Sequence, residues 1–311
     1  MSEFHHVSVL LEECMEGLNI KPDGIYVDGT LGGAGHSSRI AAQLTTGRLI
    51  GIDRDPVALK AAGERLEPFG DRVTLVHSNF SEMDSALKNL GISGVDGILL
   101  DLGVSSPQLD DGQRGFSYMA DAPLDMRMNS GDALDAREIV NHWSYEELKR
   151  ILYDYGEERF APRIAAAICK RREEKPIETT LELVDIIRGA MPASALREKQ
   201  HPAKRSFQAI RIAVNDELGS VERAMQRAIP LLNPGGRLAV ITFHSLEDRI
   251  VKNAMAEAAK GCTCPPEFPV CVCGKKPQVK LITRKPIVSG EEELERNPRA
   301  RSAKLRVCEK L

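Results

Sequence analysis

The sequence lacks three features that would set it apart from ordinary soluble proteins. No stretch of about 18 apolar residues is present, which excludes a membrane-spanning helix. The first residues carry Glu3, Glu12 and Glu13 where a secretory signal has basic residues followed by an apolar run. The seven cysteines are odd in number and unevenly spaced, unlike a disulfide framework. We therefore predict a cytoplasmic protein with no membrane contact.

Charge is unevenly distributed along a chain of otherwise average composition. Hydrophobic residues make up 42% and charged residues 28% of the 311 residues, which excludes intrinsic disorder. The net charge is -11 over residues 1–140, +3 over residues 141–212 and +6 over residues 260–311. A polyanionic partner would therefore have to meet the middle or C-terminal segment, although a solvated basic face explains the same charges.

Short apolar runs alternate with helical stretches in the first hundred residues, which predicts an α/β fold with a parallel sheet. A glycine-rich turn and helices over His36–Leu44 and Pro56–Leu66 separate the runs. The expected strands are Ile25–Asp28, Arg48–Asp53, Val73–Val76 and Val95–Asp101. Polar residues at or just beyond their ends would line the carboxyl edge of the sheet, where open α/β folds bind ligands: Asp28, Asp53, Asn79 and Asp101.

After Asp101 the next convincing strand, Arg237–Phe243, comes only after 135 residues. A crossover needs about 10–30 residues, so we predict an inserted helical domain over residues 131–212. The sheet domain then comprises residues 1–130 and 213–311.

Helix signals mark the insertion and the return to the sheet. Capping boxes begin at Ser144 and Thr179, and an amphipathic run over Phe207–Leu232 leads into the fifth strand. Two further runs, Val279–Thr283 and Ala303–Val307, are expected to close the sheet as an antiparallel pair.

The glycine loop from Asp28 to Gly35 follows a strand and opens a helix. It does not fit the dinucleotide pattern, because Ser38 falls in its last position, and the Walker lysine is also missing. The loop resembles the first motif of Rossmann-like S-adenosylmethionine-dependent methyltransferases. By that resemblance Asp53 accepts the ribose hydroxyls and Gly33 to His36 contact the methionine end. The alternative is a turn rich in glycine with a surface aspartate.

Two further positions on this edge suit the same ligand. Phe80 offers a flat apolar face to adenine, although core packing explains it equally. Asp101 opens a segment in which Ser106, Pro107 and Gln108 partly match the amine-binding motif of amino-methyltransferases. The match lacks the second proline and the aromatic residue of that motif.

Longer strings across nearly the whole chain resemble the family of ribosomal RNA small subunit methyltransferase H, which methylates the N4 amine of a cytidine in the decoding region of 16S rRNA. The strings are His6–Leu11, Asp28–Ser37, Leu100–Asp110, Arg114–Ser117, Pro123–Met128, Tyr155–Phe160, Phe243–Arg249 and Asn297–Ser302. The resemblance implies a Rossmann-like class I methyltransferase sheet interrupted by a helical domain, with S-adenosyl-L-methionine as cofactor. Its implied cofactor residues are Ala34, Gly35, His36, Asp53, Phe80, Asp101 and Gln108.

Cytosine N4 must be aimed, desolvated and relieved of a proton during such a transfer. Asp101 and Ser106 are the candidates to accept hydrogen bonds from the amine. His244 is the candidate to relay the proton or bind the base, although a helix start at Ser245 explains this segment equally.

Other residues are candidates for RNA contacts. A segment with Arg114, Phe116, Tyr118 and Arg127 suits stacking an extruded base and gripping its phosphate, or forming a polar lid. Candidate backbone contacts are Lys204, Arg205, Arg211, Arg296, Arg299, Arg301, Lys304 and Arg306.

Four cysteines, Cys262, Cys264, Cys271 and Cys273, lie within twelve residues and are candidate ligands of one tetrahedral metal such as a structural zinc ion. The family resemblance implies no metal, and buried thiols or a redox-labile loop explain the cluster as well.

The leading hypothesis is an rRNA methyltransferase that acts on 16S rRNA of the small ribosomal subunit. The alternatives are a DNA amino-methyltransferase with the same sheet-edge chemistry and an rRNA-binding assembly factor that uses the cofactor only as a ligand. The sequence leaves open whether the substrate is naked rRNA or an assembled subunit, and whether the protein forms a homodimer.

Overall fold

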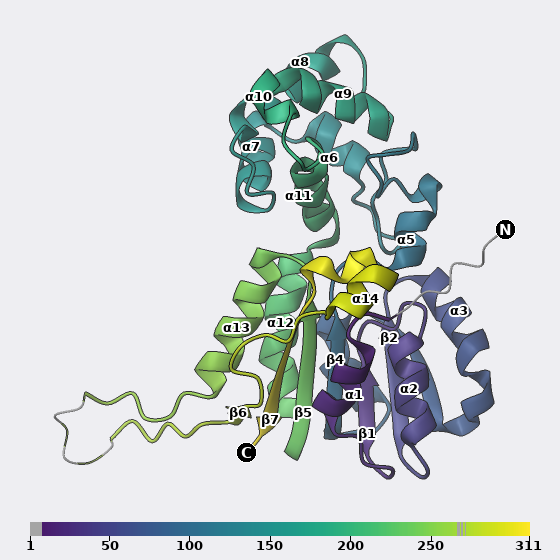
Figure 1. Cartoon of the computed structure of the whole chain (residues 1–311), viewed down its shortest axis with the longest axis vertical. Coiled ribbons are helices and arrows are strands. Elements are labelled where there is room, and N and C mark those ends of the chain that lie inside the picture. Colours follow the sequence, from purple (N-terminus) through teal and green to yellow (C-terminus); the bar gives the residue numbers. More distant parts are fainter. Residues whose placement is uncertain (1–7, 266–267, 269, 271) are drawn as a thin grey trace. The chain divides into compact units, whose positions relative to one another are not determined.

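The computed structural model describes residues 8–265, 268, 270 and 272–311, without the side chains of Ser106 and Pro107. The chain forms two compact units. The sheet unit holds the described residues up to Gly103 and those from Leu218 onward, and the helical unit holds Val104–Glu217. Figure 1 follows the chain through both units.

The sheet unit is built on seven strands in the order β3-β2-β1-β4-β5-β7-β6. Neighbouring strands from β3 to β5 are parallel, and β7 is antiparallel to both β5 and β6. The predicted α/β class and the antiparallel closing strands are therefore confirmed. The strands are β1 Ile25–Asp28, β2 Arg48–Asp53, β3 Val73–His77, β4 Val95–Asp101, β5 Leu232–Thr242, β6 Val279–Leu281 and β7 Lys304–Lys310.

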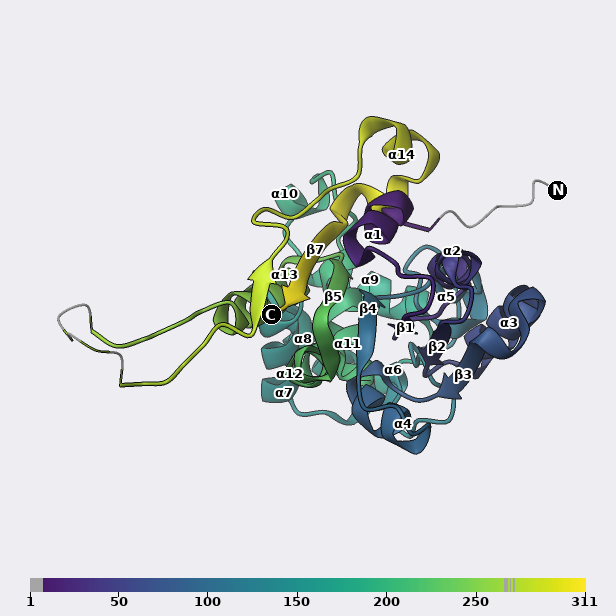
Figure 2. The ribbon, with the colours of Figure 1, turned by 90° about the horizontal axis from the view of Figure 1, so that it is seen from below.

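Helices cover both faces of the sheet (Figure 2). Because successive strand residues point to opposite faces, Val27 and Ile98 pack with α4, α12 and α13, whereas Tyr26 and Leu99 pack with α1 and α2. The helices are α1 Leu11–Leu18, α2 Gly35–Gln43, α3 Pro56–Leu66, α4 Met83–Asn89, α12 Glu217–Leu231, α13 Ser245–Ala258 and α14 Glu291–Arg296; the 3-10 turns are η1 Glu67–Arg72, η2 Phe80–Glu82 and η4 Pro298–Ser302.

Two boundaries differ from those predicted. Strand β5 begins at Leu232 rather than at Arg237, and its pairing with β4 shifts where Gly235 adopts a φ of 78°. The amphipathic run before it is two helices, because Asp216 has a φ of 46° and ends the first of them. Asp216 closes that helix through its backbone N–H, which donates to Ile212 O.

The helical unit has its own apolar core, in which residues of the segment before α6, such as Phe116 and Leu124, pack against Ile151 and Phe207. This packing is why the unit begins at Val104, earlier than the predicted residue 131. Both predicted capping boxes, at Ser144 and Thr179, are confirmed at the starts of α7 and α9. The elements are α5 Ser106–Asp110, η3 Gly112–Arg114, α6 Ala136–His142, α7 Tyr145–Asp154, α8 Ala161–Glu174, α9 Thr180–Ala190, α10 Ala193–Leu196 and α11 Lys204–Asn215.

None of the described helices combines the length and the apolar composition that crossing a membrane requires.

Candidate active site at the carboxyl edge of the sheet

Acidic side chains end three neighbouring parallel strands of the sheet unit. Asp28 ends β1, Asp53 ends β2 and Asp101 ends β4, while β5 on the far side of β4 leads directly into His244 at the start of α13. Parallel strands carry their carboxyl ends to one edge, so the topology gathers these groups there.

Asp28 stabilises the glycine loop through buried hydrogen bonds. Its carboxylate is 1% exposed and accepts hydrogen bonds from the Thr30 backbone N–H at 3.1 Å and the Ser37 hydroxyl at 2.6 Å. Burial raises the pKa of Asp28, although both hydrogen bonds oppose that shift. Asp28 therefore shapes the loop and is not exposed to a ligand.

The backbone of the glycine loop is tight on one side and open on the other. A Cβ on Gly29 would lie 2.5 Å from Leu100 Cδ2 and 3.0 Å from Phe80 Cβ, and one on Gly35 would lie 1.8 Å from Ser8 Oγ. A Cβ on Gly33, by contrast, would meet nothing within 4 Å. Ala34 has a φ of 56°, a conformation that non-glycine residues adopt rarely and often at functional sites. The loop thus presents open backbone at Gly33.

Asp53, at the end of β2, stabilises the glycine loop through a hydrogen bond. Its Oδ2 accepts the Gly32 N–H at 2.8 Å, and its Oδ1 accepts the Asp55 N–H at 2.8 Å. Burial raises the pKa of Asp53 to about 6. A carboxylate has about four acceptor positions, so Asp53 keeps acceptor capacity beyond these two bonds.

Asp101 has a buried carboxylate oxygen that none of the described residues satisfies. Its Oδ1 is buried without a hydrogen-bond partner among the described residues, and its Oδ2 lies 3.8 Å from His36 Nδ1. Burial raises the pKa of Asp101 to about 8, with further contributions from the negative charges of Asp28 and Glu247. An unpaired buried carboxylate oxygen is costly, and such atoms often mark functional sites.

His36 positions Asp101 from the start of α2. The imidazole is 5% exposed, and its Nε2 lies 3.0 Å from Val9 O. This contact fixes the ring so that Nδ1 faces Asp101. The geometry gives His36 a supporting place beside Asp101, and its predicted contact with a cofactor stays a prediction.

His244 caps helix α13 in a reciprocal pair with Glu247. Its Nδ1 accepts the Glu247 N–H at 3.4 Å, while Glu247, 1% exposed, accepts the Phe243 N–H at 2.9 Å. His244 Nε2 lies 3.1 Å from Glu247 Oε1. The helix cap predicted at Ser245 is therefore His244 itself, and its imidazole is oriented by a buried carboxylate.

Phe80 begins the turn η2 just beyond β3 and is partly buried against the sheet core. The preceding Asn79 accepts the Ser81 N–H at 2.9 Å and so holds this turn. Phe80 contributes to the core and is still partly accessible, so the structure is compatible with both predicted roles.

Two predicted site residues belong to the helical unit. Gln108 in α5 is 6% exposed, and its Oε1 accepts the Ser105 N–H at 3.1 Å. Ser106 begins the same helix, and its side chain lies outside what the structure describes. The roles of both residues stay predictions.

The predicted base-stacking segment serves the helical unit itself. Phe116 is 6% exposed within the apolar core, so its proposed exposure to an extruded base is wrong. Arg114 donates to the carbonyls of Arg127 and Met128, both at 2.9 Å, and Arg127 pairs with Asp125 at 2.7 Å. Arg114 and Arg127 therefore stabilise the loop to which they themselves belong.

Sequence reasoning missed two hydroxyls that organise the edge. The Asp101 backbone N–H donates to Thr30 Oγ1 at 2.5 Å, and Ser37 donates to Asp28. Both hydroxyls belong to the Asp28–Ser37 string itself. The hydroxyl residues beside the loop glycines could have predicted these contacts. A loop that encloses buried carboxylates has to supply hydrogen-bond donors to them.

The predicted metal ligands are partly described. Cys262, Cys264 and Cys273 bring their sulfur atoms within 4.8 Å of one another, whereas Cys271 lies outside the described residues.

The sequence model of the MraW methylase family matches residues 3–311. Ribosomal RNA small subunit methyltransferase H of Brevibacillus brevis is 62% identical over 309 residues, covering 99% of this chain and 98% of the relative. The protein of the same name from Heliobacterium modesticaldum is 60% identical over 310 residues, covering 99% of each chain. Among solved structures, an rRNA methylase from Streptococcus thermophilus has a TM-score of 0.44 and 11% identity, covering 98% of this chain and 99% of that one.

Proposed function

Because the chain belongs to the MraW methylase family, we propose that it transfers a methyl group from S-adenosylmethionine to the N4 amine of a cytidine in the decoding region of 16S rRNA. The buried, unpaired Oδ1 of Asp101 beside the glycine loop is the observation that carries the proposal. The relatives named for rRNA methylation, matched over almost their full length, support the RNA substrate.

The residues of the edge fit S-adenosylmethionine. The space that a side chain at position 33 would occupy is open, so a ligand can approach the backbone of Gly33 closely. The pKa values of Asp28, Asp53 and Asp101 are all raised, chiefly by burial. A group of buried carboxyls whose pKa values are raised favours a positively charged ligand, because such a ligand favours the charged form of each acid.

We assign the binding roles by residue. Asp53, which retains free acceptor capacity, accepts the ribose hydroxyls, and Phe80 contacts the adenine. The loop from Gly33 to Gly35 lies along the methionine end, while His36 holds Asp101 in place. Gln108 is the one assigned cofactor residue that lies in the helical unit.

S-adenosylmethionine supplies the methyl group as an electrophilic sulfonium. Asp101 Oδ1 accepts a hydrogen bond from the N4 amine and takes its proton as the nitrogen–carbon bond forms and the sulfur–methyl bond breaks, so that S-adenosylhomocysteine leaves. A pKa of about 8 suits this task near neutral pH, because a base is most effective when its pKa lies close to the working pH. Ser106 is assigned as a second acceptor, and His244, oriented by Glu247, as the residue that relays the proton or binds the base.

Transfer assays distinguish this function from its alternatives. The protein is incubated with labelled S-adenosylmethionine and, separately, with small ribosomal subunits, naked 16S rRNA and DNA. We expect label in rRNA from at least one of the two rRNA substrates and none in DNA. Label in DNA indicates a DNA amino-methyltransferase, and cofactor binding without any transfer indicates an assembly factor.

Replacing Asp53 by Ala is expected to weaken S-adenosylmethionine binding by about 1.5–3 kcal/mol, the range for losing hydrogen bonds to a charged group. The change removes the proposed acceptor of the ribose hydroxyls and also the hydrogen bond from the Gly32 N–H. Isothermal titration calorimetry measures the affinity. Asp71→Ala is the matched control, since Asp71 is exposed and lies just before β3, at the opposite edge of the sheet from Asp53. Unchanged affinity in Asp53→Ala removes Asp53 from the ribose site.

The preference for S-adenosylmethionine over S-adenosylhomocysteine is expected to rise with pH. The two ligands differ by the transferred methyl group and the positive charge. Asp101 is charged above its pKa of about 8 and becomes neutral as pH falls through that value, so its attraction for the sulfonium is lost at low pH. We expect the affinity ratio to increase about tenfold between about pH 6 and about pH 9.

Calorimetric titrations of both ligands at several pH values measure this ratio. Both ligands carry the same amino acid moiety, so changes in its protonation affect both affinities equally and cancel in the ratio. Asp101→Asn should flatten the dependence. A flat ratio in the parent protein, or the same slope in the variant, contradicts the assignment of Asp101.

A further inference from the structure

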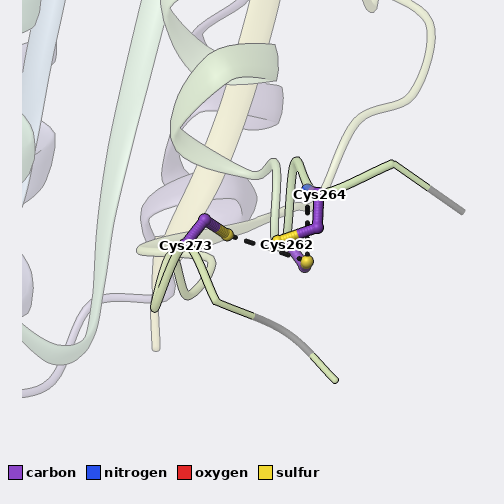
Figure 3. A group of neighbouring side chains, drawn as sticks. All are labelled: Cys262, Cys264 and Cys273. Atoms are coloured by element: carbon purple, nitrogen blue, oxygen red, sulfur yellow. Dashed lines mark hydrogen bonds between the residues drawn. The ribbon is translucent and has the colours of Figure 1, made fainter. Parts of the chain in front are cut away.

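Three cysteine side chains converge where the chain leaves α13 for β6. Cys262 and Cys264 follow the helix, and Cys273 lies on the return path to the sheet. Figure 3 shows the three sulfur-bearing side chains gathered at one point. This cluster takes no part in the proposed methyl transfer.

The spacing of the sulfur atoms matches a shared tetrahedral metal. Cys262 Sγ and Cys273 Sγ are 3.7 Å apart, and all three sulfur atoms lie within 4.8 Å of one another. A tetrahedral zinc ion with bonds of about 2.3 Å to sulfur places its ligand atoms about 3.8 Å apart. A disulfide would require about 2.05 Å.

Backbone amides point at all three sulfur atoms. Cys264 N donates to Cys262 Sγ at 3.4 Å, Thr263 N to Cys273 Sγ at 3.5 Å, and Val272 N to Cys264 Sγ at 3.3 Å. Hydrogen bonds of this kind stabilise negative charge on sulfur and orient the ligands of thiolate metal centres. The adjacent Gly274 has a φ of 63°, which lets the chain turn immediately after Cys273.

The segment needs an external constraint because it has little core of its own. The described residues between α13 and β6, which we call the arm, extend away from the sheet (Figures 1 and 2). The described apolar residues of the arm are largely exposed, with Val270 at 71%, Val272 at 73% and Phe268 at 49%. Small segments that bury too little apolar surface are commonly held by disulfides or metals.

We propose that Cys262, Cys264 and Cys273 bind a structural zinc ion that joins the outgoing and returning ends of this arm. Soft thiolate ligands in a tetrahedral arrangement favour zinc among the divalent metals. A fourth ligand, from the chain or from solvent, completes the tetrahedron. The ion orders the arm and has no part in the chemistry at Asp101.

Metal content of the full-length chain tests the proposal. Protein is purified with a phosphine reductant, supplied with zinc, dialysed and measured by mass spectrometry of the metal. We expect about one zinc ion per chain. Cobalt(II) added to the chelator-treated protein should give the intense charge-transfer band of cobalt bound to thiolate.

Serine variants at Cys262, Cys264 and Cys273 should each weaken zinc binding by at least about tenfold. The three residues lie at a partly or fully exposed site, so these changes should not unfold the sheet unit, which circular dichroism checks. Cys169→Ser is the matched control, because Cys169 lies in α8 of the helical unit and should leave zinc binding unchanged.

Limited proteolysis gives a second readout that is independent of methyl transfer. Removing zinc should accelerate cleavage within residues 261–277 in the parent protein and have no such effect in the serine variants. The proposal is overturned if reduced, zinc-supplied protein holds no zinc, if cobalt gives no thiolate band, or if the three serine variants bind zinc like the parent.

Discussion

Replacing Asp101 by Asn is expected to slow methyl transfer by about 100-fold or more, the scale of a lost proton-accepting or electrostatic group. The amide keeps the volume of the carboxyl but places a donor where the cytosine amine, itself a donor, needs an acceptor. The rate is measured in a single turnover with S-adenosylmethionine saturating, so that any loss of cofactor affinity does not enter. Ser106→Ala should cost less, since a neutral acceptor contributes only about 0.5–1.5 kcal/mol.

Two controls isolate the effect of Asp101. Asp96→Asn makes the same chemical change at the other end of β4, where Asp96 accepts the Ile25 N–H at 3.0 Å, and it should leave the transfer rate unchanged. The Asp101→Asn protein should melt no earlier than the parent, because burial disfavours the charged form that the amide replaces. Transfer at the parent rate would make Asp101 a cofactor ligand only, and His244 would become the better candidate for handling the proton.

Replacing residues 104–217 by a flexible linker of about ten residues is expected to abolish RNA methylation while S-adenosylmethionine binding stays measurable. We propose that the helical unit recognises the RNA, and the deletion also removes Ser106, the assigned second acceptor of the amine. The apolar clusters of the sheet unit contain no residue from 104–217, so this unit keeps its whole core. Some loss of affinity is expected, because the assigned cofactor contact at Gln108 is removed.

The boundaries of this deletion matter. Removing only residues 132–199 would leave Phe116, Leu124 and Phe207 without the rest of their core, and such a variant should unfold in part. Circular dichroism and calorimetry with S-adenosylmethionine show whether the linker variant is folded and binds cofactor. If that variant methylates rRNA at the full rate, the helical unit has no part in substrate recognition.

The sheet could be predicted because its signals are local. Strands β1, β2 and β4 occupy the predicted residues, since each is a short apolar run that ends at an aspartate. The two capping boxes fixed helix starts for the same reason. The shifted pairing of β5 could not be predicted, because it is set by contacts with β4, which is distant in sequence. The helix end at Asp216 could not be predicted either, because aspartate adopts the left-handed conformation only occasionally.

The positions of the acidic residues in the site could be predicted, but the residues that contact them could not. The positions of Asp53 and Asp101 follow from the strand ends. The contacts of Asp101 with Thr30 and His36 depend on how the loop folds over the sheet edge. Phe116 illustrates the opposite error, since an aromatic residue between cations suggested base stacking, whereas tertiary packing places it in a core.

The most direct test of the proposed function is to identify the nucleoside that the protein makes. Small ribosomal subunits and naked 16S rRNA lacking the modification are each incubated with S-adenosylmethionine and the parent protein, and in parallel with Asp101→Asn. The rRNA is then cut into fragments, digested and analysed by mass spectrometry. We predict N4-methylcytidine in the decoding-region fragment with the parent protein, and at least about 100-fold slower formation with the variant. Methylation at a carbon atom, at another base or at a cytidine outside that fragment would contradict the proposed function.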